Sequence, residues 1–429
     1  MKITDVKAAK IGTTIVIRVV TDKDGIDGYA QIESNKDYVM PLIPYFKSMI
    51  IGHDPTDVER VLRQMRRSAA FKPWGKVFSS IEMALWDIAG KEAGIPVYKL
   101  LGGKVRDKVR VYNGSFLDPN PPHEVADTPE KLGENILHLN EIPEGFTIVK
   151  VAAFWHMRNF YGEGDAYNTY YPEGEGKGNR RGGYTEYLKM MNENKTFSPQ
   201  LNKPVTEGSL LTEKGLKASI DFVERLKKVV GDKVGLAFDI GPGFMPGDVI
   251  RLAQALEPYN IMWLEDSIAG DYTPYTMASV YRDITTSTST PIHTGEQIFL
   301  RQNFMDLIET RAVDVVGPDP ADVGGIKELK WIAEYADLHG ILMAPHGTFN
   351  GVFGMAALTH VCSTMPQNYV AYEFPGANPG FWLDIIEGLP NNYLRDGHVK
   401  VWDAPGIGIT FNVNKASKYL SPEDKDFFR

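Results

Sequence analysis

From about residue 146 onward, short apolar runs alternate with longer amphipathic stretches, and this alternation constrains the fold more than any other feature of the chain. The apolar runs lie at residues 147–153, 234–239, 261–265, 292–295, 314–316, 341–344 and 369–373. Helical stretches lie between them, at residues 210–230, 247–256, 301–309, 326–339 and 351–362. A strand followed by a helix, repeated in this way, predicts an α/β fold with a parallel barrel of the TIM type.

The residues before this repeat have a different pattern. Alternating runs at residues 2–10, 14–21 and 28–33 predict strands, with a turn at Asp24-Gly25. Residues 55–67 and 77–93 carry apolar residues at helical spacing, and Asp54 is the expected N-cap of the first of these helices. We therefore expect three parts: an α+β capping domain at residues 1–115, a barrel at 116–374, and a C-terminal segment at 375–429 that packs on the cap.

Composition excludes several classes of protein. A chain of 429 residues is too long for one compact core. The net charge of −9 provides no basic stripe for a nucleic acid. Cys362 is the single cysteine, so it forms no internal disulfide and is expected to be buried. We expect no signal peptide and no membrane-spanning run, and a cytoplasmic location follows by default.

Three carboxylates, Asp239, Glu265 and Glu296, stand at the ends of successive predicted strands. The carboxyl ends of barrel strands meet at one mouth, so these acids would repel each other unless a cation lay between them. Carboxylate oxygens favour Mg²⁺, Mn²⁺ or Ca²⁺. One such acid alone would equally be a solvated strand end or an ion-pair partner. Three on successive units favour a metal site.

A second pair, Asp319 and His346, follows the next two predicted strands. A carboxylate bonded to one ring nitrogen of a histidine fixes the tautomer and raises the basicity of the other nitrogen. The pair is therefore a candidate general base. The alternative, a surface histidine in a Pro-Gly loop, does not account for the matching position of Asp319.

These motifs together resemble the enolase superfamily, in its mandelate racemase/muconate lactonizing enzyme branch, over nearly the whole chain. The resemblance includes the expected cap, the helix from Ser79 to Asp87, the three acids, and three further motifs: Leu100-Leu101-Gly102-Gly103, Pro318-Asp319 followed by Gly324-Gly325, and His346. It implies a (β/α)7β barrel, one Mg²⁺ per subunit, a small carboxylate substrate bound to the metal, and an enediolate formed by removal of the α-proton. Lys150 would then place a positive charge beside the substrate oxygens, and Glu373 would be an acid on the far side.

The sequence also departs from this family. Many members carry a second lysine two residues after Lys150, or a histidine two residues after the first metal acid, where this chain has Ala152 and Gly241. A racemase needs a base on each face, so racemisation is not expected. Dehydration needs only His346, as in members that resemble rhamnonate dehydratase, and this favours an acid-sugar dehydratase that acts on an aldonate or aldarate. The alternatives are a cycloisomerase or epimerase, and an inactive relative that only binds, against which the intact acids argue.

A Tyr- and Gly-rich segment at about residues 155–205 interrupts the repeat. In the family a loop between the first two cap strands covers the substrate, whereas here Ile11-Gly12-Thr13 leaves almost no loop. We expect the insertion to replace it, with Arg180 or Arg181 holding a second carboxylate and His156 acting as an acid on the second face. The alternative is a contact between subunits, and a homo-oligomer is expected.

Overall fold

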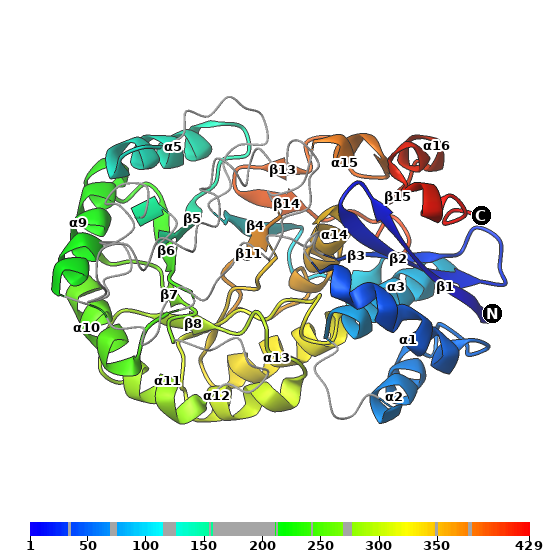
Figure 1. The fold of residues 1–429 in the computed structure, drawn as a ribbon, viewed down its shortest axis with the longest axis horizontal. Coiled ribbons are helices and arrows are strands. Elements are labelled where there is room, and N and C mark those ends of the chain that lie inside the picture. The colour runs from blue at the N-terminus through cyan, green and yellow to red at the C-terminus, as the bar shows by residue number, and fades with distance from the viewer. Residues whose placement is uncertain are drawn as a thin grey trace.

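The computed structural model describes residues 1–32, 36–68, 75–114, 126–153, 156–157, 211, 213–241, 243–268, 277–347, 351–375 and 380–429. Figure 1 shows a barrel beside a smaller cap, with both chain ends on the cap. No helix in these ranges is long and apolar enough to cross a lipid bilayer.

Parallel strands form the barrel. They are β4 (Lys108–Asn113), β5 (Ile148–Ala152), β6 (Gly235–Asp239), β7 (Leu264–Glu265), β8 (Ile292–Thr294), β9 (Val315–Val316), β10 (Leu342–Met343) and β11 (Tyr372–Phe374). Strands pair in chain order from β4 to β10, and β11 pairs with β4. A bridge between Met343 and Tyr369 closes the ring, so the predicted barrel is confirmed.

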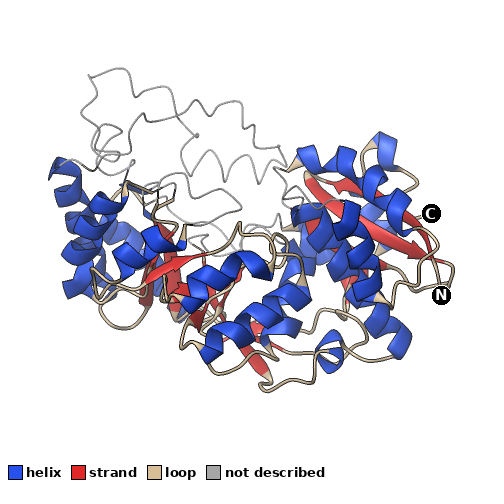
Figure 2. Ribbon diagram, turned by 90° about the horizontal axis from the view of Figure 1, so that it is seen from below, coloured by secondary structure: helices blue, strands red, loops and turns tan. Residues whose placement is uncertain are grey.

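Helices enclose these strands (Figure 2). They are α5 (Pro129–Glu141), α9 (Glu213–Val230), α10 (Pro246–Leu256), α11 (Ala278–Thr285), α12 (Met305–Glu309), α13 (Ile326–Leu338) and α14 (Gly351–Cys362), with the short turns η4 (Glu257–Tyr259) and η5 (Arg301–Phe304). Helices α5 and α11 were not predicted from the sequence. Strand β4 lies within the predicted cap range, 1–115, but it belongs to the barrel sheet, so the barrel starts ahead of residue 115.

The cap consists of one antiparallel sheet and its helices. The strands are β1 (Ile3–Ile11), β2 (Thr14–Thr21) and β3 (Gly28–Ile32), and the helices are η1 (Asp37–Leu42), α1 (Ile43–Ile50), α2 (Val58–Ser68), α3 (Gly75–Ala93) and α4 (Val97–Leu100). Ile11 pairs with Thr14, so only Gly12 and Thr13 connect β1 to β2, as predicted. Asp54 does not cap α2. It accepts a hydrogen bond from the Thr56 amide at 2.9 Å in a turn that precedes the helix.

The C-terminal segment packs on the cap, as predicted. It contains α15 (Phe381–Asp384), β12 (Ile386–Glu387), β13 (Leu394–Arg395), β14 (His398–Lys400), β15 (Thr410–Phe411), α16 (Val413–Ala416), η6 (Ser417–Tyr419) and η7 (Pro422–Asp424). Leu420 bridges to Ile11 of β1, and Arg18 of β2 donates to the Phe427 carbonyl at 2.6 Å. Strand β14 also pairs with β4, so the segment joins both parts of the molecule.

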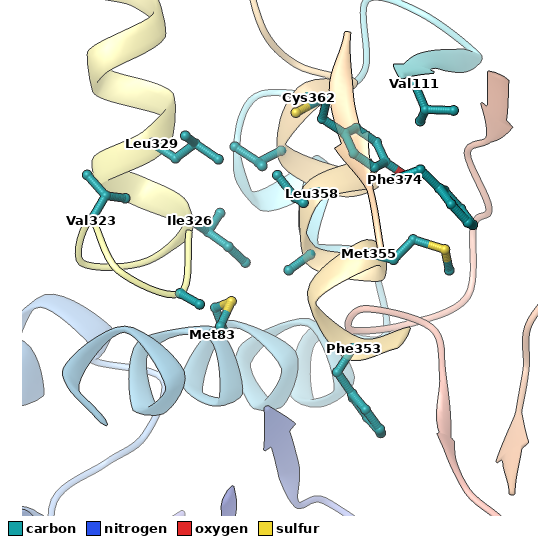
Figure 3. Close-up of a cluster of buried hydrophobic side chains, with 14 of the residues drawn as sticks. Met83, Val111, Val323, Ile326, Leu329, Phe353, Met355, Leu358, Cys362 and Phe374 are labelled. Atoms are coloured by element: carbon teal, nitrogen blue, oxygen red, sulfur yellow. The ribbon is translucent and has the colours of Figure 1, made fainter. Parts of the chain in front are cut away.

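Helix α3 holds the cap on the barrel. Glu82 is fully buried and accepts hydrogen bonds from the Ile326 amide at 2.8 Å and the Lys327 amide at 3.0 Å, which are free donors of the first turn of α13. Apolar side chains fill the space around this contact, and Figure 3 shows Met83 of α3 in one cluster with side chains of α13 and α14. The same cluster buries Cys362, as predicted.

Candidate active site

Charged side chains gather where the barrel strands end. Asp239 and Glu265 are the last residues of β6 and β7 and are register partners, so their side chains lie side by side on the inner face of the barrel. Lys150 belongs to β5 and Glu373 to β11. Glu296 follows β8 by two residues. The strand-end positions predicted from the sequence thus belong to one end of one barrel.

Lys150 lies at the centre of this group. Its ammonium is buried and contacts Glu265 directly. It lies 3.3 Å from Glu373 Oε1 and 3.9 Å from Asp239 Oδ2. Burial by itself would lower the pKa of Lys150, but the surrounding carboxylates raise it well above its ordinary value. The lysine is therefore a fixed cation at neutral pH.

The predicted metal ligands repel one another. Desolvation raises the pKa of Asp239, Lys150 opposes this shift, and repulsion from Glu265 and Glu296 adds to it. Desolvation likewise raises the pKa of Glu265. Lys150 lowers this pKa, whereas repulsion from Glu373 and Glu296 raises it. A cation that binds between these acids would stabilise their ionised, negatively charged forms.

Ligand geometry for a metal is only partly formed. Among the described residues, no three His, Cys, Asp or Glu side chains are close enough together to hold an ion as they stand. In this conformation Lys150 engages Glu265, and Glu296 Oε2 lies 3.2 Å from His346 Nε2. The oxygen donors, their negative charge and their strand-end positions fit a divalent cation, provided that these side chains turn toward it.

His346 and Asp319 form the predicted pair. Nδ1 of His346 lies 2.6 Å from Asp319 Oδ2, and Oδ1 of Asp319 accepts from the Ala321 amide at 2.6 Å. Asp319 is fully buried, and the bond from the Ala321 amide orients the carboxylate that holds the imidazole ring. The second ring nitrogen, Nε2, is thereby directed away from Asp319.

Two further carboxylates face that second nitrogen. His346 Nε2 lies 3.2 Å from Glu296 Oε2 and 3.2 Å from Glu373 Oε2. Burial would lower the pKa of His346, but Glu296, Glu373 and Asp319 raise it well above its ordinary value. His346 therefore carries its proton in this conformation. It can act as a base only after it has lost this proton, which requires that the facing carboxylates be neutralised or turn away.

Aromatic residues form the floor beneath the acids. Trp263 of the loop before β7 donates from Nε1 to Glu265 Oε2 at 2.9 Å, and His293 Nδ1 lies 3.2 Å from the same oxygen. The Trp263 ring stacks on His293 with centroids 5.2 Å apart and meets the edge of Tyr112 at 5.4 Å. These residues were not among the predicted site residues. The sequence does contain a signal for Trp263, because a residue two positions before Glu265 in a strand shares its face.

The other predicted site residues are His156, Arg180 and Arg181. His156 is buried, and burial lowers its pKa to about 4, so its imidazole is neutral at pH 7. Arg180 and Arg181 lie outside the described residues, as does most of the insertion.

Two family models match the chain. The model of the enolase C-terminal domain-like family matches residues 179–416, and that of the mandelate racemase/muconate lactonizing enzyme N-terminal domain matches residues 3–102. The second range corresponds to the cap, and the first covers most of the barrel and part of the C-terminal segment.

Individual relatives agree with these matches. A D-xylonate dehydratase of Haloferax volcanii is 28% identical, with 98% of this chain and 89% of that protein covered. A D-mannonate dehydratase of Caulobacter vibrioides is 29% identical, with 98% of this chain and 95% of that protein covered. Among solved structures, a mandelate racemase/muconate lactonizing enzyme from Jannaschia has a TM-score of 0.75 at 26% identity, with 98% of each chain covered. The chain belongs to the mandelate racemase/muconate lactonizing enzyme family of the enolase superfamily.

Proposed function

We propose that this protein dehydrates an acid sugar, an aldonate or aldarate, to a 2-keto-3-deoxy acid. The observation that carries the proposal is the His346–Asp319 pair, whose second ring nitrogen, Nε2, faces the same group of charges as Lys150. The dehydratase names of the relatives that match nearly the full chain support the same reaction class.

Asp239, Glu265 and Glu296 would hold one Mg²⁺. When bound, this cation supplies positive charge to the substrate carboxylate and so makes the α-proton more acidic. Lys150 adds a second positive charge from β5, and its contact with Glu373 would keep its ammonium in place when Glu265 turns to the cation. These charges lie in a buried site, where they stabilise an anionic intermediate more strongly than they would in water.

His346 would carry the proton in both directions. In its neutral form Nε2 takes the α-proton, the C–H electron pair moves onto the substrate carboxylate, and Asp319 stabilises the resulting imidazolium. The same Nε2 then gives its proton to the β-hydroxyl, which leaves as water while the C–O bond breaks. The enol that remains becomes the 2-keto-3-deoxy acid. This sequence requires the proton and the hydroxyl to leave from the same side of the substrate.

Residues on β5 and β6 argue against the alternatives in the same superfamily. A racemase or epimerase of this type needs a second base opposite His346. Ala152, two residues after Lys150, carries no basic group, and neither does Gly241, which follows β6. A single base suffices for elimination on one face, so the dehydratase is the function that these residues favour.

A panel of aldonic and aldaric acids tests the proposal. The protein should convert at least one of them to a 2-keto acid, and chelation of Mg²⁺ should stop turnover. His346→Asn should also lose exchange of the substrate α-proton with deuterium from the solvent, and Asp319→Asn should reduce it at least 10-fold, because the imidazole loses its orienting partner. Appreciable exchange by His346→Asn would assign the base to another residue, and no turnover of any acid by the wild type would reject the reaction.

A further inference from the structure

The floor of the site contains a polar atom that the proposed reaction does not use. Tyr112 of β4 is fully buried, and its hydroxyl has no hydrogen-bond partner in the described part of the chain. Buried hydroxyls in native proteins almost always have a partner, because an unpaired one costs free energy. An exception inside an active site points to a partner that arrives with the ligand.

The position of Tyr112 is set by its strand. Tyr112 is the register partner of Glu373 on the neighbouring parallel strand β11, so both side chains point into the barrel. The Tyr112 ring lies 5.4 Å from that of Trp263 and 5.9 Å from Lys150 Nζ. The phenol therefore stands beside the cation that faces the proposed substrate carboxylate.

The hydroxyl is a hydrogen-bond donor at every ordinary pH. Desolvation raises the pKa of Tyr112 well above its ordinary value. The negative charges of Glu373, Glu265 and Glu296 raise this pKa further, and the positive charge of Lys150 opposes them. The neighbouring acids already have donors of their own. Glu373 accepts from the Gly347 amide at 3.3 Å and lies beside Lys150, and Glu265 accepts from Trp263.

We propose that the Tyr112 hydroxyl donates a hydrogen bond to the carboxylate of the bound acid sugar, on the side of Lys150. This inference rests on the proposed function and names a residue that contacts the substrate. When the α-C–H bond breaks, the proton passes to His346 Nε2 and the electron pair moves onto the carboxylate oxygens. The hydrogen bond from Tyr112 strengthens at that moment, because its acceptor gains charge.

Tyr372 provides a matched control. It lies on β11 and is as completely buried as Tyr112, but its hydroxyl lies 2.9 Å from Thr359 Oγ1 of α14, outside the barrel interior. Tyr→Phe removes one oxygen atom at either position. At position 372 it breaks an internal hydrogen bond, and at position 112 it breaks none with the residues that the structure describes.

The experiment compares Tyr112→Phe with Tyr372→Phe in the full-length protein. It measures kcat and KM with Mg²⁺ and an acid that the wild type turns over, and stability by urea unfolding without substrate. Tyr112→Phe should lose roughly 10- to 100-fold in kcat/KM, mostly in kcat, with stability equal to or above that of the wild type. Tyr372→Phe should lose stability and keep its kcat/KM.

Two results would overturn the inference: a kcat/KM of Tyr112→Phe within twofold of the wild type, or a stability loss as large as that of Tyr372→Phe. If the wild type turns over no acid sugar, the proposed function fails. The urea unfolding of Tyr112→Phe then still tests whether the Tyr112 hydroxyl has a partner within the protein. Undiminished stability of Tyr112→Phe would then support a hydroxyl reserved for a ligand, and reduced stability would reject it.

Discussion

Glu265 is the residue on which the charges of the site converge. It is fully buried, contacts Lys150, accepts from Trp263 Nε1 at 2.9 Å and lies 3.2 Å from His293 Nδ1. These contacts use both of its oxygens and hold the carboxylate at the end of β7, next to Asp239. For a cation to bind here, Oε1 would have to turn from Lys150, while the contacts of Oε2 with Trp263 and His293 keep the rest of the carboxylate in place.

Glu265→Gln should therefore lose Mg²⁺ affinity and activity while the protein remains folded. The amide keeps the shape of the side chain but removes the negative charge that attracts the cation. Titration calorimetry with Mg²⁺ measures the affinity, and circular dichroism checks the fold. Glu334→Gln, an exposed position on α13, is the control and should bind Mg²⁺ as the wild type does. Unchanged affinity in Glu265→Gln would exclude this residue from the metal site.

At the scale of elements, the contact between α3 and α13 depends on a glycine. Gly325 precedes α13 with φ of 101°, and a Cβ atom there would come within 1.9 Å of Glu82 Oε2. The side chain of Glu82 could not then accept from the amides of Ile326 and Lys327. The family motif Gly324-Gly325 thus has a physical reason, which is close approach between the cap and the barrel.

Gly325→Ala should cost about 3 kcal/mol or more of unfolding free energy, from backbone strain together with the displaced Glu82. Gly102→Ala separates these two effects. Gly102 has nearly the same φ as Gly325, 105°, but a Cβ atom there would meet nothing within 4 Å, so backbone strain alone should cost about 1 to 3 kcal/mol. Urea unfolding measures both variants, and equal losses would show that the contact with Glu82 contributes nothing.

Helix α14 buries a histidine that makes stability depend on pH. Burial lowers the pKa of His360 to about 4, against an ordinary 6.5, while its Nε2 donates to the Ile407 carbonyl at 3.1 Å. The unfolded chain therefore takes up a proton as pH falls through 6.5, and the folded chain does so only near pH 4. Stability is lost between these values and changes no further below them.

His360→Phe should be less stable than the wild type at pH 7, and the difference should shrink by about 2 kcal/mol at pH 5. Urea unfolding of both proteins at the two pH values measures this change. Other buried histidines contribute equally to both proteins and cancel in the comparison. A difference that is the same at both pH values would mean that His360 titrates normally in the folded protein.

The elements differ in how far the sequence could predict them. The alternation of polar and apolar residues placed Asp239 and Glu265 at strand ends, because this pattern is local. The chain segment 108–113 has the same local pattern, yet β4 is a barrel strand only because it pairs with β5 and β11, partners that lie far along the chain. Tyr112 and His293 could not be recognised for a similar reason, since their roles depend on neighbours from other strands.

At the scale of the whole molecule, cap, barrel and C-terminal segment are mutually dependent. The last residues of the chain accept from Arg18 of the cap sheet, while β14 of the same segment extends the barrel sheet beside β4. Most of helix α3 is buried between these parts. Its Glu82 accepts from the first turn of α13, and its Asp87 accepts from the Ile407 amide at 3.0 Å. Interfaces this extensive and apolar do not open as hinges between independent domains.

We therefore expect cap and barrel to unfold in one transition. Phe46→Ala on α1 and Phe304→Ala before α12 remove fully buried rings from the cap and the barrel respectively, and each should cost about 3 to 5 kcal/mol. Because the parts share their interfaces, both variants should lower the midpoint of the same calorimetric transition. The near-ultraviolet circular dichroism signal reports on barrel residues such as Trp263. In Phe46→Ala, the midpoint of the change in this signal should fall together with the calorimetric midpoint. Two separable transitions, with Phe46→Ala shifting only one of them, would show instead that the cap unfolds independently of the barrel.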